Sequence, residues 1–238
     1  DKGIQAFVST QQLFAPDGTL VPTLIVDDVQ TLFLSLGAWF SRQYDAVRIG
    51  LTGSIGKTTT KEMMRRVIEQ SKNLLYSTGN QNSIKQIARY AQFQTFETEV
   101  WLQETGAGKP GSVDRCSSIL QPHGFIITNI GLNHVGDYGN SQEALIADKS
   151  SHDKYLPDDG VAFLNYDDPK LRELKLKHRI IRYAVNARDV DFYADNIVER
   201  DGQLTFDIHD VATGEATPAK LFTFGRHNVS NAVGAYAV

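Results

Sequence analysis

Several features that would point to other classes of protein are scarce or missing in this sequence. One cysteine, Cys116, among 238 residues leaves no internal disulfide framework, so we expect a small core residue in a reducing cytoplasm. No apolar run approaches the roughly 20 residues of a membrane-spanning helix. The formal net charge is -4, whereas a general nucleic-acid binder would carry an excess of lysine and arginine. Neither nucleic acid nor a membrane span is therefore expected as a partner.

The composition is that of a globular protein with a substantial core. Hydrophobic residues make up 41% of the chain and charged residues 22%, which fits one large domain, or one domain and a fragment of another. The first residue is Asp1 rather than methionine. At the other end, an alanine-rich helical pattern over residues 229–238 stops without a capping residue. We therefore expect the chain to be truncated at both ends.

Residues 1–45 look like the end of a separate domain. A short apolar segment at 24–26 precedes apolar residues at helical spacing over 31–40, and a polar joint follows at 42–45. This is too little chain for an independent core. We assign residues 1–45 to a partial N-terminal domain with its linker, and residues 46–238 to a second domain.

The second domain alternates strand and helix patterns. Apolar strands are predicted at 47–52, 100–102, 124–128, 161–164 and 180–183, and helices at 58–70 and 141–155. This order predicts an α/β fold with a mostly parallel sheet, helices on both faces, and the ligand beyond the carboxyl ends of the strands. Short extended segments over 190–224, with Asp201-Gly202 as a turn, predict a small antiparallel addition near the end.

A phosphate-binding loop is predicted between the first strand of this domain and its first helix. Glycines allow close approach of the backbone, the helix N-terminus attracts the anion, Lys57 reaches the terminal phosphates and Thr58 can ligate Mg²⁺. The usual first glycine of such loops is Leu51 here, so the spacing is short. The alternative is a glycine turn before an ordinary helix. The candidate ATP residues are Gly53, Ser54, Gly56, Lys57, Thr58 and Thr59.

A second candidate metal ligand stands at the end of the next predicted strand. Glu104 follows residues 100–103 and precedes a glycine turn, which is where a carboxylate can reach a metal bound at the phosphate loop. Without the phosphate loop, a solvated glutamate at a strand end would be the simpler interpretation.

Taken in order, the motifs of residues 47–238 resemble those of the Mur ligase family. The phosphate loop is followed by Thr78-Gly79-Asn80-Gln81-Asn82, Glu104-Thr105-Gly106, Thr128-Asn129-Ile130-Gly131 with His134, Ala147-Asp148-Lys149, Leu164-Asn165-Tyr166-Asp167-Asp168 and Gly225-Arg226-His227-Asn228-Val229-Ser230-Asn231-Ala232. Among the subfamilies the chain is most similar to the MurF type, which adds D-Ala-D-Ala to a UDP-linked muramoyl tripeptide. Val26-Asp27-Asp28 resembles the end of the family's UDP-binding domain, and the family's third domain has no counterpart after Val238.

The resemblance implies an ATP-dependent amide ligase in peptidoglycan precursor synthesis, which activates a carboxylate as an acyl phosphate for attack by an amine. It implies ATP and Mg²⁺ as cofactors, a UDP-linked muramoyl peptide and a small amino compound or dipeptide as partners, and a cytoplasmic location. The implied catalytic residues are Lys57, Glu104, His134 and Lys149. The implied metal ligands are Thr58, Glu104, His134 and Lys149, the last as a carbamate. Asn129, Asn228 and Asn231 would contact ATP, and Thr78, Asn80, Asn82 and Ser83 the acceptor.

The acceptor loop departs from the pattern of the MurF type. That type usually continues with a second asparagine and then Ile-Gly-x-Pro, whereas Asn82 is followed here by Ser83, Ile84, Lys85, Gln86 and Ile87. Glycine and proline restrict a backbone in ways that lysine and isoleucine do not. The departure leaves the acceptor open rather than the type of reaction.

Three alternatives therefore stand beside the MurF type. A related ligase could act on another substrate, as a poly-γ-glutamate enzyme does. A P-loop NTPase or phosphotransferase would keep the phosphate loop and leave Lys149 as an exposed helical lysine. A non-catalytic module would bind nucleotide only. Because the family's third domain helps to close over ATP, we expect the present chain alone to be inactive.

Overall fold

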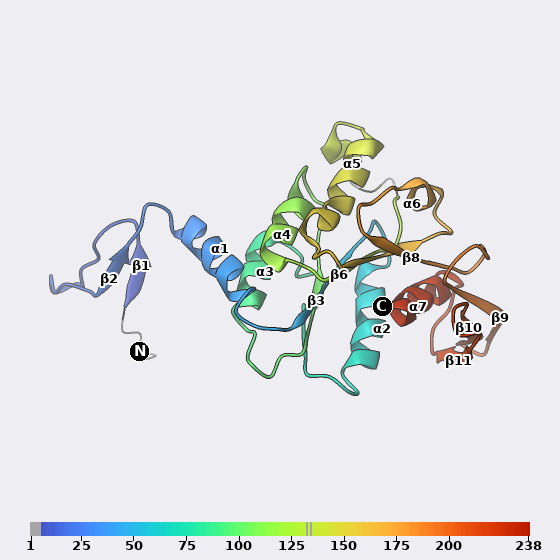
Figure 1. Ribbon diagram of the computed structural model, residues 1–238. Helices are drawn as coiled ribbons and strands as arrows, with labels where there is room; N and C mark the ends of the chain where they lie inside the picture. The colour runs from blue at the N-terminus through green and yellow to red at the C-terminus, as the bar shows by residue number, and fades with distance from the viewer. Residues whose placement is uncertain (1–5, 132, 134) are drawn as a thin grey trace.

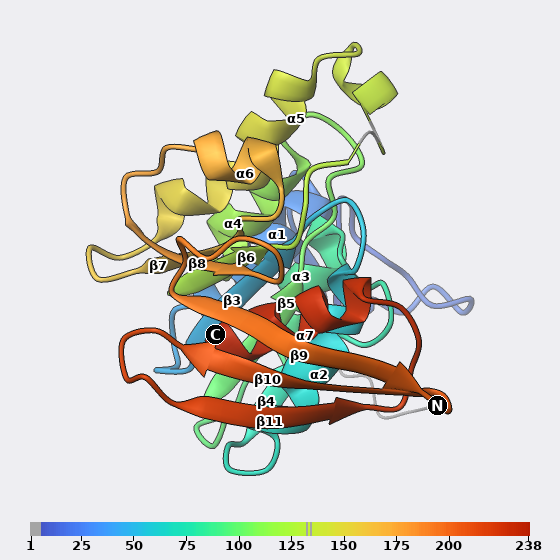
Figure 2. The same ribbon diagram turned by 90° about the vertical axis from the view of Figure 1, so that its right-hand side faces the viewer.

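The computed structural model describes residues 6–131, 133 and 135–238. Within them, one sheet has the order β11-β10-β9-β8-β7-β6-β3-β5-β4 (Figures 1 and 2). Its strands are β3 (Val47–Thr52), β4 (Leu74–Tyr76), β5 (Val100–Glu104), β6 (Gly124–Ile127), β7 (Val161–Asn165), β8 (Arg179–Ala184), β9 (Phe192–Arg200), β10 (Gln203–Asp210) and β11 (Ala216–Leu221). Neighbouring strands from β4 to β9 pair in parallel, and β9, β10 and β11 pair antiparallel. The expected fold class, including its antiparallel addition, is confirmed.

Helices cover both faces of the sheet. They are α1 (Val29–Phe40), α2 (Lys57–Ile68), α3 (Ile84–Ala91), α4 (Ser112–Leu120), α5 (Gln142–Lys149), α6 (Pro169–Glu173) and α7 (His227–Ala237), with the 3₁₀ segments η1 (Val135–Tyr138) and η2 (Ser150–Tyr155). α2 and α7 pack on one face, and α3, α4, η2 and α6 lie on the other. α1 packs outside α3 and α4 (Figure 1).

Continuous apolar strands explain these layers. Successive side chains of a strand point to opposite faces, so a parallel strand between two helical layers must be apolar on both. In β5, Leu102 packs in the core under α2 and α7, whereas Trp101 packs in the core under α3 and α4. In β6, Ile126 belongs to the first core, and Phe125 and Ile127 pack under η2 and α6.

The N-terminal part of the described chain extends from this body. β1 (Phe7–Ser9) and β2 (Thr23–Ile25) form a parallel pair of their own, and Figure 1 shows it beyond α1, away from the large sheet. Leu24 and Ile25 of β2 are 57% and 56% exposed. Within the described residues, little therefore covers the apolar side chains of this strand pair.

Some elements differ from the sequence prediction. The helix expected over 141–155 ends as an α-helix at Lys149 and continues as η2, because Ser150 Oγ donates to Ile146 O at 2.9 Å and Ser151 Oγ to Asp148 O at 2.5 Å. Such back-bonding competes with the regular helical ladder. The last helix begins at His227 rather than at 229, and β4, α3, α4 and α6 were not predicted.

Candidate functional site

The phosphate loop joins β3 to α2 in a conformation that requires glycine. Gly53 has φ 145° and Gly56 has φ 81°, a region that side chains disfavour. A Cβ at Gly53 would lie 2.0 Å from Thr128 Oγ1, and one at Gly56 would lie 2.6 Å from Asn231 Oδ1. The two glycines therefore bring the loop against β6 on one side and α7 on the other.

Side chains of the segment after β6 hold the phosphate loop in place by hydrogen bonds to the backbone of the loop. Ile55 N donates to Asn129 Oδ1 at 2.9 Å, and Asn129 Nδ2 donates back to Ile55 O at 2.8 Å. Thr128 Oγ1 donates to the same carbonyl at 2.6 Å. Asn129, a candidate ATP residue, thus supports the shape of the loop. Behind it, Asp168 accepts from Ile130 N at 2.6 Å, a supporting role that was not predicted.

Lys57 is the first residue of α2 and lies over the loop. Its ammonium donates to Gly53 O at 2.9 Å and Ser54 O at 3.4 Å. Partial burial lowers the pKa of Lys57, and the negative charge of Glu104 opposes that shift. A cation beside the free N–H groups of a helix N-terminus is suited to bind phosphate.

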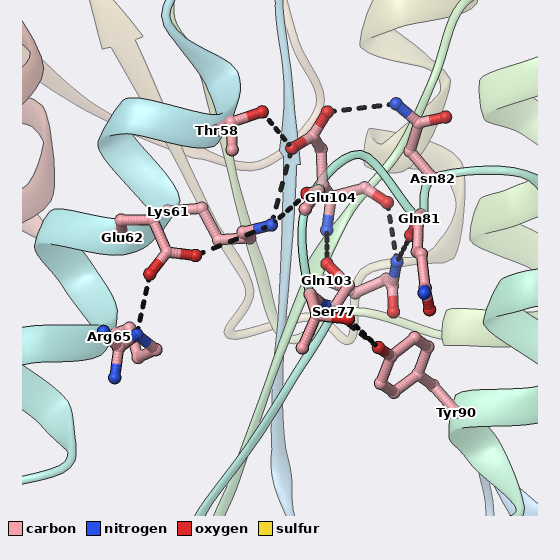
Figure 3. Close-up of polar contacts among 12 residues, drawn as sticks. Thr58, Lys61, Glu62, Arg65, Ser77, Gln81, Asn82, Tyr90, Gln103 and Glu104 are labelled. Carbon is pink, nitrogen blue, oxygen red and sulfur yellow. Dashed lines mark hydrogen bonds and ion pairs between the residues drawn. The ribbon is translucent and has the colours of Figure 1, made fainter.

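Glu104 brings the phosphate loop and the acceptor loop together. Its side chain is 1% exposed. Thr58 Oγ1 donates to Glu104 Oε2 at 2.9 Å, and Asn82 Nδ2 donates to Oε1 at 3.0 Å. Figure 3 shows the carboxylate between these two side chains. The predicted pair Thr58 and Glu104 is therefore adjacent in space although 46 positions apart.

Thr58 and Glu104 offer oxygen ligands of the kind, and in the number, that proteins commonly supply to a magnesium ion. Mg²⁺ prefers oxygen ligands and is commonly held by one or two protein groups together with water and phosphate oxygens. In residues 6–131, 133 and 135–238, no cluster of three histidine, cysteine, aspartate or glutamate side chains could hold a metal. His134, the other candidate ligand, lies outside the described residues.

The acceptor loop, residues 77–83, runs from β4 to α3. Thr78 N donates to Tyr90 Oη at 2.9 Å. Thr78, Asn80 and Ser83 are exposed. Asn82 alone of the four predicted acceptor residues touches Glu104. The four residues line one loop but do not form a single cluster.

The unusual sequence after Asn82 has a structural reason. Ser83 is the N-cap of α3, and its amide donates to Gln86 Oε1 at 2.9 Å, a pattern typical of helix starts. Ile87 is fully buried in the core formed with α1 and α4. The residues that depart from the MurF-type pattern therefore form the start of α3. Ser83 stands three residues before Gln86, which is the sequence pattern of a helix start, but no helix was predicted there.

Lys149 is buried at the end of α5, not exposed as its sequence context alone would indicate. Its side chain is 1% exposed. Burial lowers its pKa to about 8, the charge of Lys57 adds to this, and Asp148 opposes it. Asp148 is itself fixed, since it accepts from Tyr138 Oη and from Asp114 N, the latter at 3.2 Å. The site thus places two lysines near each other and holds both in a setting that disfavours charge.

Asn228 and Asn231 lie on α7 beside the phosphate loop. Asn228 Nδ2 donates to Phe224 O at 2.7 Å, which shapes the turn before α7, and Asn231 abuts Gly56. From Thr58 and Thr59 a largely apolar groove of about 850 Å³ runs between α2, α7 and the strands β10 and β11. Phe222, 77% exposed, lies at its edge.

Fold and site together define a P-loop nucleotide-binding domain. The family model "Mur ligase middle domain" matches residues 51–238. The chain is 30% identical over 221 residues to the UDP-N-acetylmuramoyl-tripeptide–D-alanyl-D-alanine ligase of Escherichia coli, covering 92% of this chain and 48% of that protein. With the ligase of the same name from Treponema pallidum it is 34% identical over 145 residues, covering 60% and 31%.

Solved structures agree with these relatives. Crystal structure II of MurF from Acinetobacter baumannii matches with TM-score 0.86 and 30% identity, over 99% of this chain and 50% of that one. MurF from Thermotoga maritima in complex with ADP matches with TM-score 0.83 at 19% identity, over 98% and 53%, which supports the fold alone. The chain belongs to the Mur ligase family. It spans about half the length of these relatives, and none of the described helices is long and apolar enough to cross a membrane.

Proposed function

We propose that the chain is the ATP-binding part of a MurF-type ligase, which joins D-Ala-D-Ala to a UDP-linked muramoyl tripeptide in the cytoplasm. Mur ligases are ATP-dependent ligases that use Mg²⁺, and the relatives named above carry this activity in their names. The observation that carries the proposal is Glu104, whose two carboxylate oxygens bind the phosphate loop through Thr58 and the acceptor loop through Asn82.

The proposed reaction has two steps. A carboxylate oxygen of the acceptor attacks the γ-phosphorus of ATP, and the bond from that phosphorus to the β,γ-bridging oxygen breaks. The products are an acyl phosphate and ADP, which is the leaving group. The amine nitrogen of the dipeptide then attacks the acyl carbon, loses a proton, and phosphate leaves. In the first step Lys57 and the amides of the loop stabilise the charge on the transferring group, which is catalysis by electrostatics and position.

The other candidate residues have supporting roles in this proposal. Thr58 and Glu104 would hold Mg²⁺, which when bound offsets the charge of the β- and γ-phosphates, and His134 would help to hold a second ion. Asn129 keeps the loop in shape. Asn228 and Asn231 would contact the nucleotide from α7, beside the phosphate loop. The remaining acceptor residues, Thr78, Asn80 and Ser83, would face the peptide.

Lys149 is proposed to react with CO₂. The neutral amine attacks the carbon and loses a proton, which leaves a carbamate. Burial and the charge of Lys57 both favour the neutral amine that this step needs, and the product replaces a cation beside Lys57 with an anion. In ¹³C NMR with ¹³C-bicarbonate we expect a carbamate signal that Lys149→Gln removes. A spectrum without that signal at saturating bicarbonate would contradict the assignment.

The proposed domain arrangement follows the family. Residues 46–238 would form the central ATP-binding domain, and residues 1–45 would be the last part and linker of the domain that binds the UDP moiety. The uncovered apolar strand β2 supports the second assignment. A third domain beyond Val238 would close the nucleotide groove and help bind the dipeptide.

The test is ADP release by the full-length protein with UDP-muramoyl tripeptide and D-Ala-D-Ala. We expect release to require both substrates, mass spectrometry to show the pentapeptide, and Glu104→Gln to lower kcat at least a hundredfold, since it removes charge at the proposed metal site. Glu69→Gln is the matched control, because Glu69 lies at the C-terminal end of α2, outside the groove, and is 36% exposed.

The outcomes separate the remaining candidates. No ADP with any UDP-muramoyl peptide and dipeptide would reject the MurF-type assignment. ADP release with another acid and amine would identify a related ligase with a different acceptor, and release without any acceptor would identify an NTPase.

A further inference from the structure

Lys61 carries a buried ammonium one helical turn after Lys57. Its side chain is 0% exposed. Nζ donates to Gly79 O in the acceptor loop at 2.5 Å and lies 3.7 Å from Glu104 Oε2. Figure 3 shows it directed from α2 toward Glu104. The function proposed above uses Lys57 and Glu104 but gives Lys61 no role.

Besides its hydrogen bond to Tyr90 of α3, the acceptor loop is attached on two further sides. Toward β5, Gln103 Nε2 donates to Gln81 O at 3.0 Å, and Ser77 Oγ accepts from Glu104 N at 3.1 Å. Toward α2, Lys61 binds the carbonyl of Gly79. Lys61 therefore connects the helix that begins at the ATP loop to the loop that faces the acceptor.

Lys61 also places a positive charge beside Glu104, the proposed metal ligand. Glu104 faces the ammonium of Lys61 directly and interacts with that of Lys57. Glu62 approaches Lys61 at 3.9 Å but is 41% exposed, so solvent screens it. A bound divalent cation would share Glu104 with Lys61, and two cations on one carboxylate repel each other.

We propose that Lys61 is a positioning residue with two coupled effects: it fixes the acceptor loop against the ATP loop, and it moderates the affinity of Glu104 for Mg²⁺. The proposal rests on the function given above for Glu104 and the acceptor loop. It predicts effects of opposite sign when the charge is removed: the loop loosens while metal binding strengthens. A residue needed only for folding would weaken both.

The experiment uses the full-length protein with Lys61→Met, which keeps the length of the side chain and removes its charge. Hydrogen exchange of the amides of residues 77–83 is expected to accelerate about tenfold or more, the size implied by losing one hydrogen bond from a charged donor. Titration with ADP at varied Mg²⁺ is expected to show a half-saturating Mg²⁺ concentration at least threefold lower. Glu69→Gln, the matched control at the C-terminal end of the same helix, should change neither.

Two further measurements keep the outcome clear. If Lys61→Met does not fold, the double variant Lys61→Met with Glu104→Gln removes both buried charges and should exchange faster at 77–83 than Glu104→Gln alone, because Glu104 also contacts this loop through Asn82. Unchanged exchange, or a higher Mg²⁺ requirement in Lys61→Met, would overturn the proposal. Hydrogen exchange and Mg²⁺ titration do not depend on ligation. If both change as expected but the protein forms no amide product, the proposed function is rejected and the proposal for Lys61 is not. In an active protein, Lys61→Met should raise KM for the acceptor more than it lowers kcat.

Discussion

Lys149 and Lys57 are two ammonium groups held close together at the candidate site. Each has its pKa lowered mainly by burial, and for Lys149 the charge of Lys57 adds to the effect. Repulsion of this kind is costly for a fold unless a ligand or a modification offsets it. The phosphates of a nucleotide would offset the charge of Lys57, and a carbamate would remove that of Lys149.

The first prediction concerns stability and pH at Lys149. The folded pKa of about 8 lies below the ordinary value of 10.5, so the native state releases this proton first. The free energy of unfolding should therefore rise between these pH values, by about 3 kcal/mol for this group. Urea denaturation of the unmodified protein and of Lys149→Met, in CO₂-free buffer, isolates the contribution. If the difference in free energy of unfolding between the two proteins stays constant across this pH range, the pKa of Lys149 is not lowered by folding.

The second prediction concerns Gly53. An added methyl group would lie 2.0 Å from Thr128 Oγ1, at a backbone angle that alanine disfavours. We expect Gly53→Ala to cost about 1–3 kcal/mol of stability and to weaken ATP binding at least tenfold. Gly108→Ala is the matched control, because nothing lies within 4 Å of a Cβ there. Thermal unfolding and calorimetric titration with ATP measure both effects. Normal ATP affinity in Gly53→Ala would show that the loop tolerates a side chain.

At the scale of elements, His152 connects three parts of the fold. Nε2 lies 2.9 Å from Thr105 Oγ1 after β5, and Nδ1 lies 2.8 Å from Ser117 Oγ on α4, while the ring itself belongs to η2. The ring stacks on Phe125 of β6 and leaves no room for a side chain at position 50 of β3. Since Thr105 follows Glu104, this network helps to fix the strand end that carries the carboxylate.

The third prediction is acid sensitivity from this histidine. Complete burial lowers the pKa of His152 to about 3 from 6.5, so the native state keeps the ring neutral while the unfolded chain takes up a proton as the pH falls. The unmodified protein should lose about 2 kcal/mol of stability between about pH 7 and about pH 5 relative to His152→Gln. Denaturant unfolding at both pH values measures the difference. Equal losses in the two proteins would show that His152 does not titrate on unfolding.

Strand positions could be predicted well because the sheet is buried on both faces. Apolar runs without a helical period have few alternatives, and β3, β6, β7 and β8 were found within a residue or two. β4 and α3 escaped because they are short: β4 has three residues, and α3 has eight. The break after Lys149 also could not be read from the sequence, because serine back-bonding competes with helix only in a particular tertiary setting.

The candidate site was predictable as a set of residues but not as an arrangement. The order of motifs in the sequence predicted Thr58, Glu104 and Asn82 as site residues. In the structure, Thr58 and Asn82 both donate hydrogen bonds to Glu104. The support from Asp168 and the burial of Lys61 and Lys149 depend on how distant segments pack. Such packing leaves no local signal, because a lysine on a polar helix has the same sequence context whether it is buried or exposed.

At the scale of the whole molecule, the main feature is the apolar groove beside the phosphate loop, which we propose holds the nucleotide. It begins at the phosphate loop and is lined by apolar side chains of α2, α7 and the antiparallel strands. Phe222 at its edge is 77% exposed. Apolar surface of this kind is commonly covered by a ligand or another domain. In the proposed ligase the domain beyond Val238 covers it and brings the amine to the acyl phosphate.

The last prediction follows from that division of the site. Residues 1–238 alone should bind Mg-ATP at least tenfold more weakly than a protein that carries the proposed third domain, because that domain would close the groove. They should also release ADP at a negligible rate, because that domain would position the amine. Calorimetry on both proteins and a coupled ADP assay measure the two effects. Lys57→Ala in residues 1–238 is the control, since it should abolish the remaining binding if that binding is at the phosphate loop. Rapid, acceptor-dependent turnover by residues 1–238 would show that the phosphate loop, Glu104 and Lys149 suffice for the chemistry and that further domains only select the substrates.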